Sequence, residues 1–507
     1  MNPTRNNKGL IILQRQFALI GNAIALELKS RYGVQEFCGY IHTRRAEQFA
    51  KTQKDIQYSS LLLDEDLHDK YRQEKLDIDY IKKLETEYGL PSLWPYIILD
   101  RSIILDIGAD YSISPTPPFT HEEMLRILQV KFRSITNFLE KERPDFVIGV
   151  NIGCIGNFIL YNVAKKMGIK TYALESGRVR NLISFTDDDK ILSGVEKIFD
   201  EIRKNNYKSP FRKDAISFLE NFRASPAPPA YAAEENTPPI RVVANLRFIL
   251  KSIFDYLRNP HKSDLTVENP TRVLMNKIRR KARSMRNMER YYDKPNFSEE
   301  FAFFPLHFEP EIATMLYAPF YANQLNLIRQ IAQSLPITFK LYVKEHPAML
   351  EYRPTEYYKE LKKIPSVKLV PTSTSSFELM KHAKIITVIT GTVGLEATFL
   401  KKPVITFGEV FFNKLSTIKR CGAIEELPTL IKNQLDNFKY DEGEVVDFLS
   451  AIFEDGIPFD FMGLWVKGGS YEEIKSNKMF PVFVDSLAKK IGLKPTFESI
   501  KNSTRIK

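Results

Sequence analysis

The sequence has few cysteines and no long apolar run. Only Cys38, Cys154 and Cys421 occur among its 507 residues, and their spacing fits neither a metal site nor a disulfide framework. No stretch of about 18 apolar residues is present, which argues against a membrane-spanning helix. Polar residues at 14–16 interrupt the apolar runs near the start, unlike a signal peptide. We therefore expect a cytoplasmic protein.

Two phosphate-binding fingerprints are also missing, G-x-G-x-x-G and the P-loop with its lysine. Their absence argues against dinucleotide-binding and P-loop domains. Positive charge is concentrated in one segment, because residues 241–294 hold 14 Lys and Arg against 5 Asp and Glu, out of a net charge of +11. The remaining chain is close to neutral, so we expect no nucleic-acid partner.

The chain is too long for one ordinary core, and short apolar runs alternate with helical patterns in both halves. This alternation predicts an α/β protein with two doubly wound, parallel sheets. The segment 60–100 is charged and helical in pattern, and the Pro- and Ala-rich stretch 224–239 is typical of a linker. The predicted divisions are an N-terminal Rossmann-like domain (1–223), a linker with a basic helical insertion (224–300), a second Rossmann-like domain (301–470) and a helical tail (471–507).

Two interpretations of the basic segment 241–294 stay open. Its apolar residues recur at helical spacing among Lys and Arg, and basic amphipathic helices bind anionic membrane surfaces. The segment would then hold the protein on the inner face of the plasma membrane. The alternative is a solvated helical hairpin packed on its own domain.

Polar residues follow the strand predicted over 338–343, where open parallel sheets bind ligands. Lys344 and His346 can neutralise a phosphate, and His346 can donate a proton to a leaving group. Pro347 restricts the residue before it to extended backbone, which would hold the imidazole in one orientation. The alternative is an ordinary charged junction between a strand and a loop.

A glycine-containing turn follows the strand predicted over 384–389. Thr390, Gly391 and Thr392 open a helix there, and exposed backbone N–H groups at a helix start suit a phosphate. Glu396 lies in the first turns of that helix and can accept hydrogen bonds from a ribose diol. The alternative is a threonine-capped helix whose glutamate faces solvent.

Ser375 and Ser376 lie in the loop before another predicted helix. Either is a good helix cap, and a hydroxyl contact with phosphate is compatible with capping. Near the start of the second domain, the run from His307 through Glu309 to Glu311 has the residue types of a metal site. A lone histidine with carboxylates is more often a surface loop, so no metal is expected.

In the first domain, Glu175 follows the strand predicted over 169–174 and is followed by Gly177 and Arg178. It is the candidate general base that takes a proton from an acceptor hydroxyl. The alternatives are a surface ion pair with Arg178, or a base among Asp187, Asp188 and Asp189.

The second half resembles a bacterial capsule and surface polysaccharide biosynthesis family, which includes Kdo transferases and distant relatives of polysialyltransferases and teichoic acid glycerophosphotransferases. The resemblance rests on "FPLHFEPE", "LPITFKLYVKEHP", "PTSTSSFELMKHA" and "ITGTVGLEATFLKKPVITFG" within 303–408; the first half matches only through "LESGR". It implies a GT-B fold and inverting transfer from a nucleotide-activated sugar without a bound metal.

By this resemblance, His346 faces the donor phosphate, Ser375, Ser376, Thr390 and Thr392 hold phosphate, and Glu396 holds ribose. The implied donor is a CMP-activated acidic sugar such as Kdo, and the implied acceptor is a surface glycan or glycolipid. No cofactor is expected beyond the nucleotide sugar. Two other functions stay open, namely a sugar-nucleotide epimerase of the same fold and a non-catalytic scaffold of a polysaccharide assembly complex.

Overall fold

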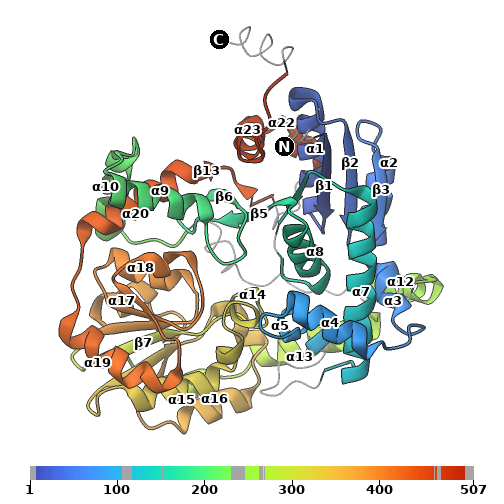
Figure 1. The fold of residues 1–507 in the computed structure, drawn as a ribbon. Helices are drawn as coiled ribbons and strands as arrows, with labels where there is room; N and C mark the ends of the chain where they lie inside the picture. Colours follow the sequence, from blue (N-terminus) through green and yellow to red (C-terminus); the bar gives the residue numbers. More distant parts are fainter. Residues whose placement is uncertain are drawn as a thin grey trace.

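The computed structural model describes residues 7–105, 117–150, 152–229, 246–261, 267, 269–461, 463–464 and 470–496. These residues form two α/β domains, each built on its own sheet (Figure 1). Sheet A comprises β1 (Lys8–Leu13), β2 (Glu36–Ile41), β3 (Tyr58–Leu63), β4 (Phe146–Gly149), β5 (Lys170–Ser176), β6 (Leu182–Thr186) and β13 (Ile457–Pro458). Sheet B comprises β7 (Phe301–Pro305), β8 (Lys340–Lys344), β9 (Val367–Val370), β10 (Ile385–Val388), β11 (Val404–Thr406) and β12 (Ile418–Arg420).

Sheet A has the order β13-β6-β5-β4-β1-β2-β3, and sheet B the order β12-β11-β10-β7-β8-β9. Every strand pair in sheet B is parallel, whereas β6 in sheet A runs antiparallel to both of its neighbours, β5 and the edge strand β13. Two mainly parallel, doubly wound sheets in separate domains make the GT-B fold, as predicted. Residues 60–63, at the start of the segment 60–100 that has a helical pattern, instead belong to the strand β3.

Helices cover both faces of each sheet because strand residues alternate between two apolar clusters. Ile11 and Leu13 face one cluster of sheet A, and Leu10 and Ile12 face the other. The first face carries α1 (Phe17–Tyr32), α2 (Arg44–Thr52), α22 (Tyr471–Ser476) and α23 (Phe480–Ile491). The second carries α3 (Asp64–Lys70), α4 (Ile78–Tyr88), α5 (Trp94–Ile98), α6 (Arg101–Ile104), α7 (His121–Glu142) and α8 (Ile155–Lys166).

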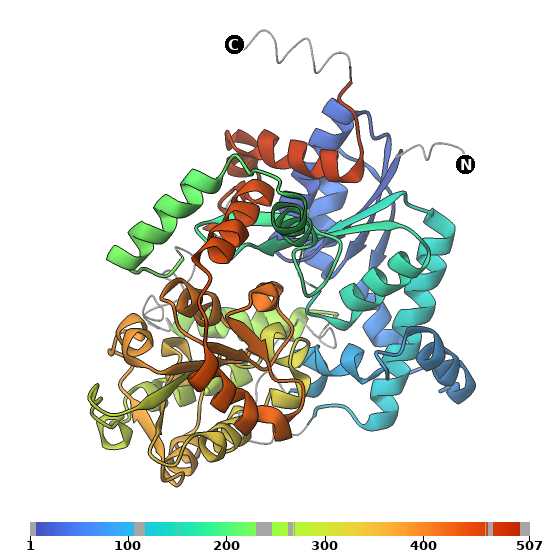
Figure 2. The ribbon, with the colours of Figure 1, turned by 60° about the vertical axis from the view of Figure 1, so that its left-hand side comes forward.

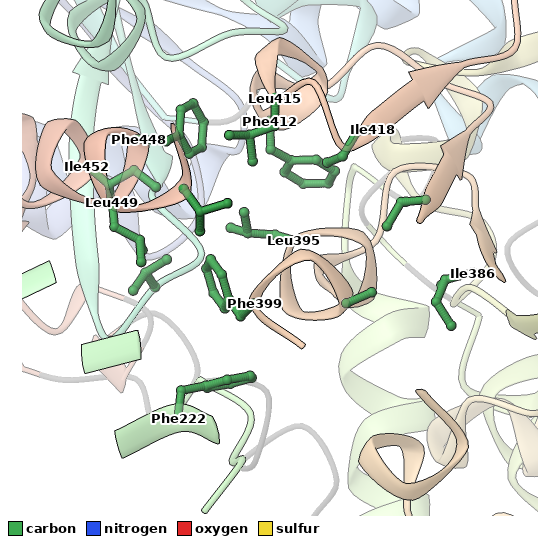
Figure 3. Packing of buried hydrophobic residues seen from close by; sticks show 14 of the residues in the cluster. Phe222, Ile386, Leu395, Phe399, Phe412, Leu415, Ile418, Phe448, Leu449 and Ile452 are labelled. Atoms are coloured by element: carbon green, nitrogen blue, oxygen red, sulfur yellow. The ribbon is translucent and has the colours of Figure 1, made fainter. Parts of the chain in front are cut away.

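Sheet B has α15 (Gln324–Ser334), α16 (Thr355–Lys362) and α19 (Leu427–Asn437) on one face. Its other face carries α17 (Ser376–His382) and α18 (Thr392–Phe399). A further layer, formed by α9 (Ser193–Asn205), α10 (Arg212–Ala224) and α20 (Glu442–Asp455), packs on these two helices. Figure 3 shows Leu395 and Phe399 of α18 between this layer and the sheet, so one apolar core joins the two domains.

The C-terminal part of the chain returns to the first domain. Residues 457–458, which the sequence analysis assigned to the second domain, add β13 to the edge of sheet A. The tail helix α23 packs on α1, and the two lie side by side in Figures 1 and 2. Within the described residues, every helix is too short or too polar to cross a bilayer.

Candidate functional site

The carboxyl ends of β10, β7 and β8 lie next to one another because these strands are neighbours in sheet B. The segments that follow them contain Gly391, His307 and His346, respectively. Residues that are about 40 positions apart in the sequence, or more, thus meet along one edge, which is where open parallel sheets bind ligands.

His346 follows β8 at this edge, and its imidazole is neutral. Its backbone is extended, with φ −68° and ψ 123°, as the following Pro347 requires. Among the residues that the structure describes, none offers a hydrogen-bond partner to its buried Nδ1. Burial, followed by the charges of Arg353 and Lys344, lowers the pKa of His346 to about 4. The ring can therefore donate or accept a hydrogen bond without carrying a charge.

A buried ion network holds the loops around His346. Glu345 Oε1 accepts a hydrogen bond from the His346 N–H at 2.7 Å, and its Oε2 lies 2.8 Å from Arg353 Nε. Arg353 also donates to Glu309 Oε2 at 2.7 Å and to the carbonyl of His307 at 2.8 Å. Glu309 is therefore paired with an arginine rather than placed in a ligand set with His307. The sequence did not reveal Arg353 as part of this network.

Lys344 and Ser376 meet between β8 and α17. Lys344 Nζ donates to Ser376 Oγ at 2.9 Å, and burial lowers the pKa of Lys344 to about 8. Ser375 caps α17, because its hydroxyl accepts the N–H of Glu378 at 3.4 Å. Capping, the expected structural role, is thus present at Ser375, while Ser376 supports the lysine.

At the turn into α18, the hydroxyl of Thr390 is already engaged. Gly391 is the N-cap residue of α18. The buried Thr390 hydroxyl already donates to the carbonyl of Ala313 at 3.1 Å, so its proton is not available to a ligand. Thr392 is half-buried at the first helical position. Glu396 does not face solvent, since only 7% of it is exposed, and burial raises its pKa to about 8.

His307 is a site residue whose importance the sequence analysis missed. Only 8% of it is exposed, and its Nε2 has no partner among the described residues. A Cβ added to Gly391 would lie 3.1 Å from His307 Cε1, so the ring packs against the turn into α18. Burial, followed by the charges of Arg178, His346 and Arg353, lowers its pKa to about 3.

Glu175 lies at the end of β5 in a pocket that both domains line. The pocket is formed by Glu175, Ser176, Arg178, Asp189, Lys190, Ile191, Leu192, Tyr317, Val410 and Phe411. Burial, opposed by Arg178 and reinforced by Asp189, raises the pKa of Glu175 to about 7. Of the three rival acids, Asp189 lines this pocket, whereas Asp188 accepts the backbone N–H of Lys190 in a turn.

Arg178 connects this pocket with sheet B. Its backbone is left-handed, with φ 56°, and its guanidinium donates to the carbonyl of Thr390. The guanidinium carbon also lies 5.5 Å from the centre of the Phe412 ring. A continuous series of contacts therefore runs from the Glu175 pocket through Arg178 to the turn that His307 borders.

This chain is similar to known proteins among the solved structures and to one family model. No curated protein matches the sequence. Among solved structures, the chain is similar to a beta Kdo 2,7 transferase, KpsC of Thermosulfurimonas dismutans, with 12% identity, a TM-score of 0.30 and coverage of 63% of this chain and 80% of that one. The KpsC beta Kdo 2,4 transferase of the same organism gives 14% identity, a TM-score of 0.33 and coverage of 60% and 78%. The UDP-GlcNAc 2-epimerase of Methanocaldococcus jannaschii gives 13% identity, a TM-score of 0.24 and coverage of 88% and 99%.

A family model described as "Capsule polysaccharide biosynthesis protein" matches residues 159–416. This range spans slightly more than half of the 507 residues. It includes the ends of β5, β7, β8 and β10, and therefore every strand end that borders the candidate site. The chain belongs to the capsule polysaccharide biosynthesis protein family.

Proposed function

We propose that this chain is an inverting glycosyltransferase that moves a sugar from a nucleotide donor onto a capsule or surface polysaccharide acceptor. One observation carries the proposal. His346, whose Nδ1 has no partner among the residues that the structure describes, lies beside Lys344 at the edge of sheet B, and contacts through Arg178 connect that edge with the half-buried carboxyl of Glu175. A cationic edge suits a leaving phosphate, and a carboxyl with a pKa of about 7 suits a general base.

In the proposed reaction, Glu175 takes the proton of an acceptor hydroxyl, and the oxygen attacks the anomeric carbon of the donor sugar. The bond between that carbon and the phosphate oxygen breaks on the opposite face, and its electron pair stays on the nucleotide phosphate. His346, Lys344 and the N-terminus of α18 would stabilise this developing charge. Glu396 would hold the ribose, since a protonated carboxyl both donates and accepts hydrogen bonds.

For the donor, we propose a CMP-activated acidic sugar such as Kdo, because Lys344 adds positive charge beside the phosphate site. A thermal-unfolding panel of CMP, UDP, GDP and CDP tests this. CMP should stabilise the protein most, by about 2.7 kcal/mol at 100 times its dissociation constant, because ligand binding to the native state alone shifts unfolding by mass action. A panel without stabilisation by any nucleotide would contradict the proposal. Product analysis with the best donor separates sugar transfer from epimerisation, and an inert donor would indicate a scaffold.

We further propose that α12 (Leu246–Arg258) and α13 (Pro270–Ser284) bind an anionic membrane surface. Six apolar side chains on or directly after these helices are at least 50% exposed, and they follow helical spacing: Leu250, Phe254, Leu257, Met275, Ile278 and Met285. Exposed Lys277, Arg279 and Lys281 lie among them on α13. Apolar side chains flanked by basic ones match the boundary between lipid headgroups and acyl chains.

The same segment also packs on its own domain, so deleting it would disturb the candidate site. Arg280 pairs with Glu351 at 2.9 Å, and Arg283 donates to the Tyr352 carbonyl at 2.8 Å, just after the His346–Pro347 turn. Reversal of exposed charges is therefore the cleaner test.

The triple variant Lys277→Glu, Arg279→Glu and Lys281→Glu should bind vesicles containing phosphatidylserine about 100-fold less tightly or worse, since each basic residue near an anionic surface contributes about 1 kcal/mol. Vesicle co-sedimentation measures this. The control reverses Lys82, Lys83 and Lys432, three exposed lysines elsewhere, and changes net charge equally. Equal binding by both variants, or no binding by the unaltered chain, would refute the membrane proposal.

A further inference from the structure

His307 occupies the centre of the candidate site. β7 lies between β10 and β8 in sheet B, and His307 is the second residue after β7, just as His346 is the second after β8. The ring packs against the turn at Gly391, which follows β10 on one side of β7, and His346 follows β8 on the other side of β7. A phosphate that reached both the N-terminus of α18 and His346 would therefore have to pass the His307 ring.

The unused nitrogen of His307 indicates a missing partner. More than nine-tenths of the residue is buried, yet its Nε2 has no hydrogen-bond partner in the described part of the chain. Burying a polar atom without a partner is unfavourable, and native structures rarely leave one so. The rest of the residue is held firmly, because its N–H donates to Gln324 Oε1 at 2.7 Å and its carbonyl accepts from Arg353. The fold therefore holds the backbone of His307 in place, while its buried Nε2 has no partner among the described residues.

The charges around the ring specify an anion. The charges of Arg178 and Arg353 act on His307, whereas the neighbouring His346 is neutral. The N-terminus of α18 adds a partial positive charge beside Gly391. Glu345 and Glu309 neutralise the charge of Arg353. The guanidinium of Arg178 donates to the carbonyl of Thr390, so its positive charge lies beside the turn into α18.

We propose that His307 is a phosphate-binding residue, whose Nε2–H donates a hydrogen bond to a non-bridging oxygen of a phosphate seated between the N-terminus of α18 and His346. That this phosphate belongs to the nucleotide donor rests on the proposed function. A nucleotide donor, inorganic phosphate and a phosphorylated acceptor all present phosphate oxygens. CMP, inorganic phosphate and glycerol 3-phosphate therefore serve as one probe for each.

The test measures the affinities of CMP, cytidine, inorganic phosphate and glycerol 3-phosphate by titration calorimetry on the full chain. His307→Ala should weaken CMP binding by about 10- to 150-fold, the usual effect of losing a hydrogen bond to a charged group, and leave cytidine binding unchanged. His307→Leu, which fills the space without a donor, should behave alike and serves if the alanine variant does not fold. His307→Gln offers an amide N–H in place of the ring nitrogen and should restore most of the affinity.

His68 supplies a matched control, because it is also a buried histidine with an unpartnered nitrogen, but it lies on α3 among Tyr71 and Phe119. His68→Ala should lower the melting temperature and leave CMP affinity unchanged. Loss of cytidine and CMP binding in equal proportion in the His307 variants would overturn the proposal, as would unchanged affinities for CMP, inorganic phosphate and glycerol 3-phosphate alike. A loss confined to inorganic phosphate and glycerol 3-phosphate would overturn the assignment to the donor.

These outcomes are independent of the proposed reaction. CMP binding that depends on His307 in a protein without transfer activity would support the phosphate site and refute the transferase. Transfer activity together with CMP binding that does not depend on His307 would support the transferase and refute the phosphate site.

Discussion

His346→Ala is expected to reduce turnover by about 10²- to 10⁴-fold while nucleotide affinity falls far less. In the proposed reaction the imidazole acts on the charge that develops as the phosphate leaves, so its loss is felt in the transition state more than in the bound ground state. The ring fits this role, because it is neutral and its Nδ1, which has no partner in the described part of the chain, can donate a hydrogen bond to the phosphate oxygen as charge appears. Steady-state kinetics and calorimetric nucleotide titration measure the two effects separately.

Two further variants serve as a comparison and a control for His346→Ala. Glu396→Ala should show the opposite balance, with nucleotide affinity reduced first, because this side chain is proposed to hold ribose. His382→Ala removes an exposed histidine, which bonds to the Glu378 carbonyl of its own helix and packs on Phe297, and should leave turnover unchanged. A His346→Ala protein that melts at a lower temperature but is fully active per folded molecule would show that His346 is structural only.

Glu175→Gln is expected to reduce turnover by about 10²-fold or more while donor binding persists, because glutamine keeps the shape of the side chain and cannot take a proton. The pKa of Glu175 is about 7, so the activity of the unaltered protein should rise with pH and level off above that value. Rate measurements from pH 5 to 9 on the protein and its variant check both statements. The residual activity of the variant should lack this rise.

The same substitution has a consequence for stability. A carboxyl whose pKa is raised on folding favours the native state at low pH, and this contribution is lost as pH rises through the folded pKa. Glu175→Gln should therefore gain stability relative to the unaltered protein between about pH 4.5 and pH 7, as urea unfolding would reveal. Near-normal turnover in Glu175→Gln, with a large loss in Asp189→Asn, would transfer the role of base to Asp189, which lines the same pocket.

Several parts of the fold could be predicted because their signals are local. Apolar runs such as residues 9–13 and 385–388 form strands since both of their faces are buried. The edge strand β3 escaped prediction because only one of its six residues is buried, and its serines break the apolar pattern. The antiparallel addition of β13 also escaped, because a strand of two residues has no sequence signal of its own.

For the candidate site, the sequence by itself determined the positions of His346, Gly391 and Glu396, because each stands at a recognisable strand end or helix start. It also determined the extended backbone at His346, since a proline follows. The tertiary structure alone decided which neighbours these residues have. Arg353 reaches Glu345 and Glu309 only because loops after two adjacent strands converge, and Arg178 reaches Thr390 across 212 positions of sequence. Such contacts depend on strand order and domain packing. Strand order and packing depend in turn on which apolar faces bury one another, and a local sequence pattern shows that a face is apolar but not which face it packs against.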